Sequence, residues 1–447
     1  MQHTVIIGNG ISGTTCARWL RKLSDQQITI ISSEAPHFFS RTALMYVYMG
    51  HMRWEDIKPY EDWFWDKNRI NLIQDKVTQI NFQVKELVLA SNRTINYTNL
   101  VLAVGSKPNK FGWPGQELNA VGGLYHKQDL DNMEACSPKL ERAVIVGGGL
   151  IGIEMAEMFL SRDIPVSMLV RESSYWNNVL PQEESEMISR HIREHHVDLK
   201  LGVNLQEIID DGRGRAKGVI VKETGEKIAC GYVGLTAGVS PNISFLKGSA
   251  LETQKGILVN EFLETNIKDI YAIGDCAQLS NPQSGRRAIE AVWYTGRMMG
   301  ETVAHNILGK ATAYNPGIWF NSAKFFDIEY QVYGEVPNIL PEDLESLYWE
   351  HPDGNKAIRI NYDKITHAVR GFNLMGIRYR HEVCEKWIAE KTKIEQVLQN
   401  MSLANFDPEF AKTHEQSFIA LFEKNTGQSI TNTSKRSLSQ VLKFLKS

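Results

Sequence analysis

Thr4-Val-Ile-Ile-Gly8-Asn-Gly10-Ile-Ser-Gly13, near the start of the chain, is the stretch that decides the fold. A short β-branched run leads into three glycines spaced G-x-G-x-x-G, and the residues that follow are typical of a helix. This order predicts a strand, a tight turn and a helix. We expect Gly8 to make the turn, Gly10 to let a pyrophosphate approach the backbone, and Gly13 to let helix and strand pack closely. The phosphates would lie at the positively polarised start of the helix.

The same pattern recurs at Ala143-Val-Ile-Val-Gly147-Gly148-Gly149-Leu-Ile-Gly152. Two such units far apart in the sequence predict two separate nucleotide-binding folds. Short β-branched runs alternate with helical stretches, which favours an α/β class with parallel sheets. Two further strands are expected to end in glycine turns, at Gly105 and Gly238.

Each of the two units is followed by a residue that could bind the ribose of a nucleotide or the phosphate attached to it. Glu34 comes after the run Ile28–Ser33, where an acid is expected to take ribose hydroxyls. In the second unit Arg171 follows Val166–Val170, and an arginine there suits the 2′-phosphate of NADP. Glu172 comes next, and a register error of one residue would favour NAD instead. The sequence therefore favours NADPH and leaves NADH open.

A third element makes the pair of glycine motifs specific. Ile270-Tyr-Ala-Ile-Gly274-Asp275-Cys-Ala277 reads as a strand that ends in Gly-Asp. An aspartate at this place can accept hydrogen bonds from the ribityl hydroxyls of a flavin, although alone it would also suit a helix N-cap. Together with two glycine motifs in this order, it indicates bound FAD.

These motifs together resemble the pyridine nucleotide–disulfide oxidoreductases, from Thr4 to about residue 335. The resemblance implies FAD on the first glycine motif and a nicotinamide nucleotide, NADH or NADPH, on the second. Glu154 and Arg41 are the catalytic candidates. The implied cofactor-binding residues are Gly8, Gly10, Ile11, Ser12, Gly13, Glu34, Arg41, Val77, Ala103, Gly105, Gly147, Gly149, Leu150, Ile151, Gly152, Glu154, Arg171, Gly238, Gly274, Asp275 and Trp319. Trp319 suits the flank of the isoalloxazine and the filling of core equally well.

The positions of the cysteines exclude two branches of this family. The helix after the first glycine motif lacks a CxxxxC pair, and Phe38-Phe-Ser-Arg41-Thr42 has an arginine where the single-cysteine members have their thiol. Arginine cannot form a sulfenate or a mixed disulfide. The segment from Glu34 to Arg41 instead resembles the rubredoxin and ferredoxin reductases and the flavin module of nitrite reductases. A guanidinium at residue 41 can bind FAD phosphate or stabilise the anionic reduced ring, the alternative being an ordinary surface ion pair.

The expected architecture is two tandem Rossmann-like, three-layer domains and an α+β C-terminal domain with a helical tail. We assign residues 1–118 and 245–318 to the FAD-binding domain, 119–244 to the NAD(P)H-binding domain and 319–447 to the C-terminal interface domain. The amphipathic end of the tail favours packing against the body of the protein or against a second subunit in a homodimer, with shallow membrane contact as an alternative. Its apolar positions are Leu438, Val441, Leu442 and Leu445.

Composition and charge argue against several classes of protein. A net charge of −3 argues against a nucleic-acid partner. No apolar run approaches the roughly 20 residues of a membrane span, and no signal peptide is recognisable, so a cytoplasmic protein is expected. The five cysteines are scattered and form no metal-ligand cluster, and His195-His196 is expected to end a solvated helix. We therefore expect no metal site. Arg286-Arg287 is a candidate surface for an acidic partner.

The function that follows is an FAD-dependent NAD(P)H oxidoreductase. Hydride passes from the nicotinamide to FAD, and electrons then leave the flavin directly because no redox thiol can relay them. The favoured acceptor is a small redox protein such as a rubredoxin or ferredoxin. One alternative is a quinone or other small molecule. Another is a redox-sensitive binding module resembling apoptosis-inducing factor.

Overall fold

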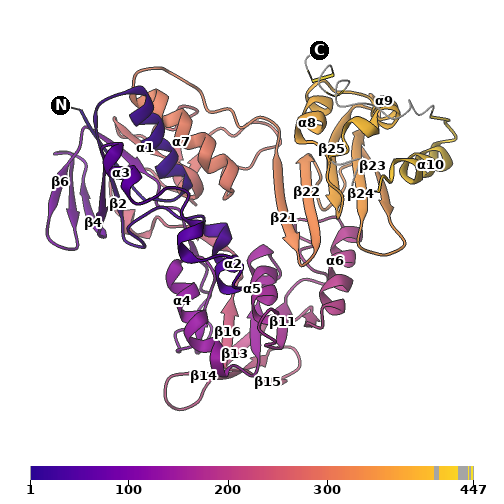
Figure 1. Ribbon diagram of the computed structural model, residues 1–447, viewed down its shortest axis with the longest axis horizontal. Helices are drawn as coiled ribbons and strands as arrows, with labels where there is room; N and C mark the ends of the chain where they lie inside the picture. The colour runs from indigo at the N-terminus through magenta and orange to yellow at the C-terminus, as the bar shows by residue number, and fades with distance from the viewer. Residues whose placement is uncertain (1, 407–411, 431–440, 442–443, 446–447) are drawn as a thin grey trace.

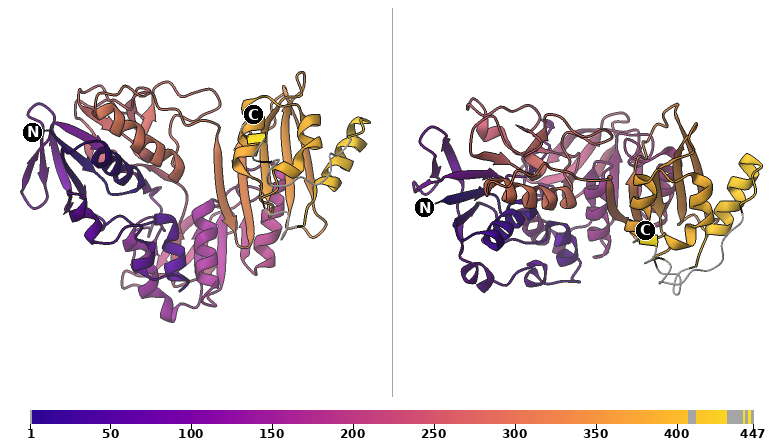
Figure 2. Two further views of the ribbon diagram at one scale, coloured as in Figure 1. Left: turned by 45° about the horizontal axis from the view of Figure 1, so that its top comes forward. Right: turned by 90° about the horizontal axis from the view of Figure 1, so that it is seen from above.

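The computed structural model describes residues 2–406, 412–430, 441, 444 and 445. Three bodies are visible in Figure 1: an N-terminal sheet with its helices, a second sheet below it, and a C-terminal sheet at the other side. In both views of Figure 2 the C-terminal sheet lies at the end of the molecule far from the N-terminus.

The first body is a five-stranded parallel sheet with the order β19-β7-β1-β2-β3. Its central strands consist mainly of buried apolar residues, as is typical of a parallel sheet. Helices α1 and α7 lie side by side (Figure 1), and a Cβ on Gly300 of α7 would be 2.5 Å from the carbonyl oxygen of Ser12. The elements are β1 (His3–Ile7), α1 (Ile11–Leu23), β2 (Gln27–Ser32), β3 (Ile70–Gln74), β7 (Asn99–Leu102), β19 (Ile270–Ala272) and α7 (Trp293–Ile307).

A second parallel sheet has the order β12-β11-β10-β16-β9. Its elements are β9 (Val121–Gly122), α4 (Lys127–Cys136), β10 (Ala143–Val146), α5 (Leu150–Leu160), β11 (Val166–Val170), α6 (Gln182–Glu194), β12 (Asp198–Leu201) and β16 (Tyr232–Leu235). The two links between the sheets, β8 (Ser106–Pro108) and β17 (Val239–Pro241), pair antiparallel. Smaller antiparallel sheets complete both bodies, with strands β4 (Val77–Asn81), β5 (Glu86–Leu89) and β6 (Thr94–Asn96), and β13 (Leu205–Asp210), β14 (Ala216–Val221) and β15 (Lys227–Ala229).

The third body is a five-stranded antiparallel sheet with the order β21-β22-β25-β24-β23 and a layer of helices. Its elements are β21 (Phe320–Phe325), β22 (Ile328–Gly334), β23 (Leu344–Glu350), β24 (Ala357–Asp363), β25 (Val369–Met375), α8 (His381–Ala389), α9 (Ile394–Gln399) and α10 (Glu415–Thr426). The predicted fold class, two Rossmann-like sheets followed by an α+β unit, is confirmed. The exact domain boundaries stay a prediction.

The described part of the tail lies on the third body. Val441 is buried, and Phe444 and Leu445 pack against the same apolar cluster. The Phe444 ring lies 6.1 Å from that of Trp387 on α8. Leu438 and Leu442, two of the predicted apolar positions, lie outside the described residues. Among the helices that the structure describes, none combines the length and apolarity needed to cross a membrane.

A buried ion pair joins helix α6 of the second body to the third. Glu184 accepts hydrogen bonds from Arg359 of β24 at 2.7 and 2.8 Å, and Asn373 of β25 donates to it at 3.0 Å. The Glu184 side chain is 1% exposed and that of Arg359 is 7% exposed. Burial raises the pKa of Glu184, against the lowering effect of Arg359. Neighbouring Glu183 also meets Arg359, at 2.8 Å, but is 52% exposed.

These two neighbours form a matched pair for testing this junction. Glu184→Gln should lower the free energy of unfolding by about 3 kcal/mol, because it leaves a buried guanidinium without its closest countercharge. Glu183→Gln should cost less than about 1 kcal/mol, because water screens that carboxylate. Urea unfolding of both variants, followed by fluorescence, measures the difference. Equal losses in the two variants would contradict the role given to Glu184.

Candidate cofactor site

The three glycines of the first motif have three distinct surroundings. Gly8 has a φ of +113°, and a Cβ there would be 2.1 Å from the carbonyl oxygen of Ala103. A Cβ on Gly13 would be 2.1 Å from the carbonyl oxygen of Gly8. At Gly10 a Cβ would meet nothing within 4 Å. The first and third glycines therefore serve packing, while the second leaves open space at the start of α1.

The second motif repeats this division. Gly147 has a φ of +130°, and its Cβ would be 2.5 Å from the carbonyl oxygen of Thr236. A Cβ on Gly152 would be 2.8 Å from the carbonyl oxygen of Gly147, whereas one on Gly149 would meet nothing within 4 Å. Gly10 and Gly149 are the N-caps of α1 and α5, and neither helix start is capped by a side chain. Open backbone at an uncapped helix start fits a pyrophosphate at both places.

The end of β19 meets the start of α1. Gly274 has a φ of +72°, and a Cβ there would be 2.4 Å from the Ser12 hydroxyl oxygen. Asp275 follows directly, and burial raises the pKa of its carboxyl group. The structure thus brings Ser12, Gly274 and Asp275 to the edge of the sheet that also carries the first glycine motif. A carboxylate beside an open helix start fits a cofactor with a pyrophosphate and hydroxyl groups.

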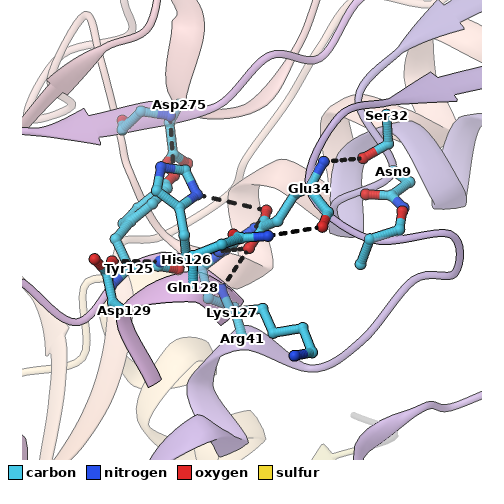
Figure 3. A network of polar contacts seen from close by, with 12 residues as sticks. Asn9, Ser32, Glu34, Arg41, Tyr125, His126, Lys127, Gln128, Asp129 and Asp275 are labelled. Atoms are coloured by element: carbon cyan, nitrogen blue, oxygen red, sulfur yellow. Dashed lines mark hydrogen bonds and ion pairs between the residues drawn. The ribbon is translucent and has the colours of Figure 1, made fainter. Parts of the chain in front are cut away.

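A polar network extends from Asp275 to Glu34, as Figure 3 shows. Arg41 donates to both carboxylate oxygens of Glu34, at 2.8 and 2.6 Å, and to the carbonyl oxygen of Tyr125. The Tyr125 hydroxyl accepts from the backbone N–H of Ser106 at 2.9 Å and donates to Asp275 at 3.4 Å. The guanidinium also lies 4.7 Å from the centre of the Tyr125 ring. The network therefore connects the chain after β2, β7 and β19 with the segment that leads into α4.

Glu34 is the most heavily bonded member of this network. Besides Arg41, the backbone N–H of Lys127 donates to it at 2.9 Å, and His126 lies 3.6 Å away. Although burial acts to raise it, these hydrogen bonds and charges hold the pKa of Glu34 at about 2. The bidentate pair differs from the expectation of a free ribose acceptor. The assignment of Glu34 to ribose hydroxyls stays a prediction that requires this pair to rearrange.

Sequence reasoning missed Tyr125, His126 and Lys127. One signal was present: Asp129 accepts from the backbone N–H groups of Tyr125 and His126, at 2.9 and 2.8 Å, which is the N-terminal capping that a carboxylate near a helix start provides. That signal marks where α4 begins. It does not reveal that the residues just before the helix reach the first body.

Other predicted site residues lie outside this network. Val77 is buried at the start of β4, Ile11 is half-buried against the apolar core of the first body, and Leu150 and Ile151 are half-buried against a cluster to which all three bodies contribute. Gly105 and Gly238 have φ values of +63° and +87° at the two links between the sheets.

The guanidinium of Arg286 lies over the Trp319 side chain, 5.2 Å from the centre of the Trp319 ring. Arg286 forms a buried ion pair with Glu290 at 2.5 Å, so the expectation that Arg286 belongs to an exposed surface for an acidic partner is wrong, whereas Arg287 is exposed and its part in such a surface stays a prediction. The Arg286 side chain is 6% exposed, and a desolvated, paired guanidinium offers no charge to a partner.

The second body carries the predicted nicotinamide-nucleotide residues. Glu154 is half-buried on α5, where burial, reinforced by the charge of Glu157, raises its pKa to about 7. Arg171 is the first residue after β11, as predicted, and its exposed side chain pairs with Glu172 at 2.8 Å. These residues show no direct contact with the network around Glu34.

All five cysteines are buried. Burial raises the pKa of Cys230 and of Cys276 to about 12, and raises the pKa values of Cys16 and Cys384 as well. Thiolates, not thiols, are the redox nucleophiles, so none of these four has the environment of a redox-active cysteine.

Two parallel sheets, each with an open glycine motif at a helix start, define a protein that binds two dinucleotides. The sequence profile described as pyridine nucleotide-disulphide oxidoreductase matches residues 2–300, and the chain belongs to this family. The predicted family and its two cofactors, FAD and a nicotinamide nucleotide, are thereby confirmed.

Several known proteins are similar to this chain. The rubredoxin-NAD(+) reductase of Acinetobacter baylyi is 30% identical over 293 residues, which are 63% of this chain and 73% of that protein. The nitrite reductase [NAD(P)H] of Bacillus subtilis is 28% identical over 62% of this chain, but this chain spans only 34% of that relative's length. The solved structure of an NAD-dependent persulfide reductase from A. fulgidus matches with a TM-score of 0.83 at 21% identity, covering 95% of this chain and 84% of that one, and so supports the fold alone.

The two open glycines provide reciprocal tests of the site. Gly10→Ala should give a folded protein with reduced FAD content, since the new methyl meets no protein atom but occupies the approach to the helix start. Gly149→Ala should keep FAD and weaken binding of the nicotinamide nucleotide. The ratio of flavin absorbance to protein, circular dichroism and nucleotide titration separate these effects. FAD loss in both variants, or in neither, would contradict the assignment.

Proposed function

We propose that this protein is an FAD-dependent NAD(P)H oxidoreductase whose electrons leave the flavin without a thiol relay. One observation carries the proposal: residue 41, where the thiol of single-cysteine relatives is expected, is an arginine bonded to Glu34 and Tyr125, and all five cysteines are buried. FAD, when bound, supplies the chemistry that accepts hydride and releases electrons. The protein supplies binding, orientation and charge.

Individual residues have distinct tasks in this proposal. The starts of α1 and α5 hold the two pyrophosphates, and Asp275 accepts from ribityl hydroxyls. Arg41 has two positions open to it, on Glu34 or on an anionic group of the cofactor, because a guanidinium binds carboxylate and phosphate equally well. Glu154 orients the carboxamide end of the nicotinamide.

The favoured acceptor is a small one-electron carrier protein. The name of the Acinetobacter baylyi relative, a rubredoxin-NAD(+) reductase, supports this class. A quinone acceptor would require contact with a membrane, and the described apolar residues of the tail, Val441, Phe444 and Leu445, already pack against the third body. A cytoplasmic location and a homodimer formed through residues 319–447 complete the proposal.

Anaerobic stopped-flow mixing with NADH and with NADPH tests the proposal. Loss of flavin absorbance within seconds, followed by its return on addition of an oxidised rubredoxin or ferredoxin, is the expected result. A protein that stays colourless after addition of FAD would overturn the proposal. A yellow protein that neither nucleotide reduces would favour a binding module in place of an enzyme.

Arg171 and Glu172 decide between the two nucleotides. If the Arg171 guanidinium leaves Glu172 for a 2′-phosphate, Arg171→Gln should lower the ratio of kcat/KM for NADPH to that for NADH by about tenfold or more, the value of a charged hydrogen bond. Glu172→Gln should raise the same ratio, because it removes both a competitor for the arginine and a repulsive charge. A ratio unchanged in both variants would place nucleotide selection elsewhere.

A further inference from the structure

Three side chains on two different bodies converge at the C-terminal end of helix α6. His191 and His195 are four residues apart, so they lie on one face of the helix end. Asp327 comes from the turn between β21 and β22, beside which Figure 1 shows α6. The Nε2 atoms of His191 and His195 lie 2.6 and 3.1 Å from the same Asp327 carboxylate oxygen. One ligand atom from each of the three residues lies within 4.8 Å of the others.

The surroundings hold both imidazole rings in this orientation. The Nδ1 atom of His191 lies 3.5 Å from the carboxylate of Glu194, the type of outer partner that fixes a histidine with Nε2 turned towards a metal. The ring of His195 stacks on that of Phe326, with centres 4.2 Å apart and planes 11° apart. Phe326 has a left-handed φ of +55°, which brings the ring and the carboxylate of the next residue to the same helix end.

The charge and the exposure of this cluster also suit a cation. The last carbonyl groups of α6 give its C-terminal end a partial negative charge, to which Asp327 and Glu194 add. His191 is buried, His195 is 37% exposed and Asp327 is 71% exposed, so one side of the cluster is open to water. Two imidazole nitrogens and one carboxylate oxygen, with an open fourth position, are a known ligand set for Zn²⁺.

We propose that His191, His195 and Asp327 bind a divalent transition-metal ion of the zinc class, which joins the second body to the third. The ligand atoms of a tetrahedral zinc ion lie about 3.4 Å apart, given bonds of about 2.0–2.1 Å. The observed 2.6 and 3.1 Å therefore need to widen by less than 1 Å. The exposed Asp327 side chain has room for that movement. This site was not expected from the sequence, which draws attention to His195-His196 but does not predict the partner in the β21–β22 turn.

An arrangement held by hydrogen bonds alone is the competing explanation, because two imidazole N–H groups can share one carboxylate oxygen. Asp327→Asn separates the two explanations. The amide oxygen still accepts hydrogen bonds, but a neutral amide is a much poorer ligand for zinc than a carboxylate. His195→Gln is the second test variant, since glutamine retains a donor without an imidazole. His196→Asn is the matched control, because His196 neighbours the cluster without joining it and asparagine tolerates its φ of +62°.

The experiment uses the full chain with FAD, treated with a chelator, dialysed and titrated with ZnCl₂ in competition with a chromogenic chelator. The expected result is one zinc ion per chain in the wild-type and His196→Asn proteins. Affinity should be at least about tenfold weaker in Asp327→Asn and His195→Gln, since loss of even an outer partner costs about 10–100-fold. Zinc should also raise the thermal midpoint of the wild type but not of Asp327→Asn. No stoichiometric binding, or equal binding by all four proteins, would overturn the proposal.

Discussion

The architecture depends on the close approach of three backbone segments that only glycine permits. At the first motif, the end of β1, the start of α1 and the residues after β7 meet so closely that a single Cβ on Gly8 or Gly13 would lie 2.1 Å from a carbonyl oxygen. A side chain at either position would separate the helix from the sheet. The same constraint recurs at Gly147 and Gly152, with 2.5 and 2.8 Å. In each motif the first and third glycines pack against backbone, and only the middle glycine, Gly10 or Gly149, borders open space where a ligand fits.

A second constraint holds the second body against the third through α6. At the start of this helix Glu184 lies in a buried ion pair with Arg359, and at its end His191 and His195 meet Asp327. Burial of the Glu184 carboxylate raises its pKa, and the hydrogen bonds from Arg359 and Asn373 offset the cost of this desolvation. A helix fixed at both ends cannot rotate independently of the C-terminal sheet. Both contacts lie between α6 of the second body and the C-terminal sheet, so they act together to hold the two bodies against each other.

The fold could be predicted from the sequence because the motifs that specify it are short. The strand–glycine–helix pattern at Gly8 and Gly147 is set by backbone conformation within ten residues, and the structure reproduces it at both places. The place of Arg171 was likewise predictable from the length of β11. Contacts between segments that are distant in the sequence could not be predicted in this way. Arg286 and Glu290 are only four residues apart, so their pairing is itself local, but the burial of both side chains depends on distant packing: Arg286 also donates to the carbonyl oxygen of Gly317 and lies over the ring of Trp319.

The network around Arg41 shows the same limit at the site. Glu34 and Arg41 were both found in the sequence, but their mutual bond required the chain between them to fold back. Tyr125 lies in the segment between β9 and α4, which belongs to the second sheet and its helices, yet its hydroxyl reaches Asp275 at the end of β19. The polar groups beside the first glycine motif are thus supplied by two bodies. Any movement of Arg41 from Glu34 to a bound anion would also loosen its bond to Tyr125. If Arg41 binds the cofactor as proposed, cofactor binding at α1 and the placement of the second sheet would be coupled through this one guanidinium.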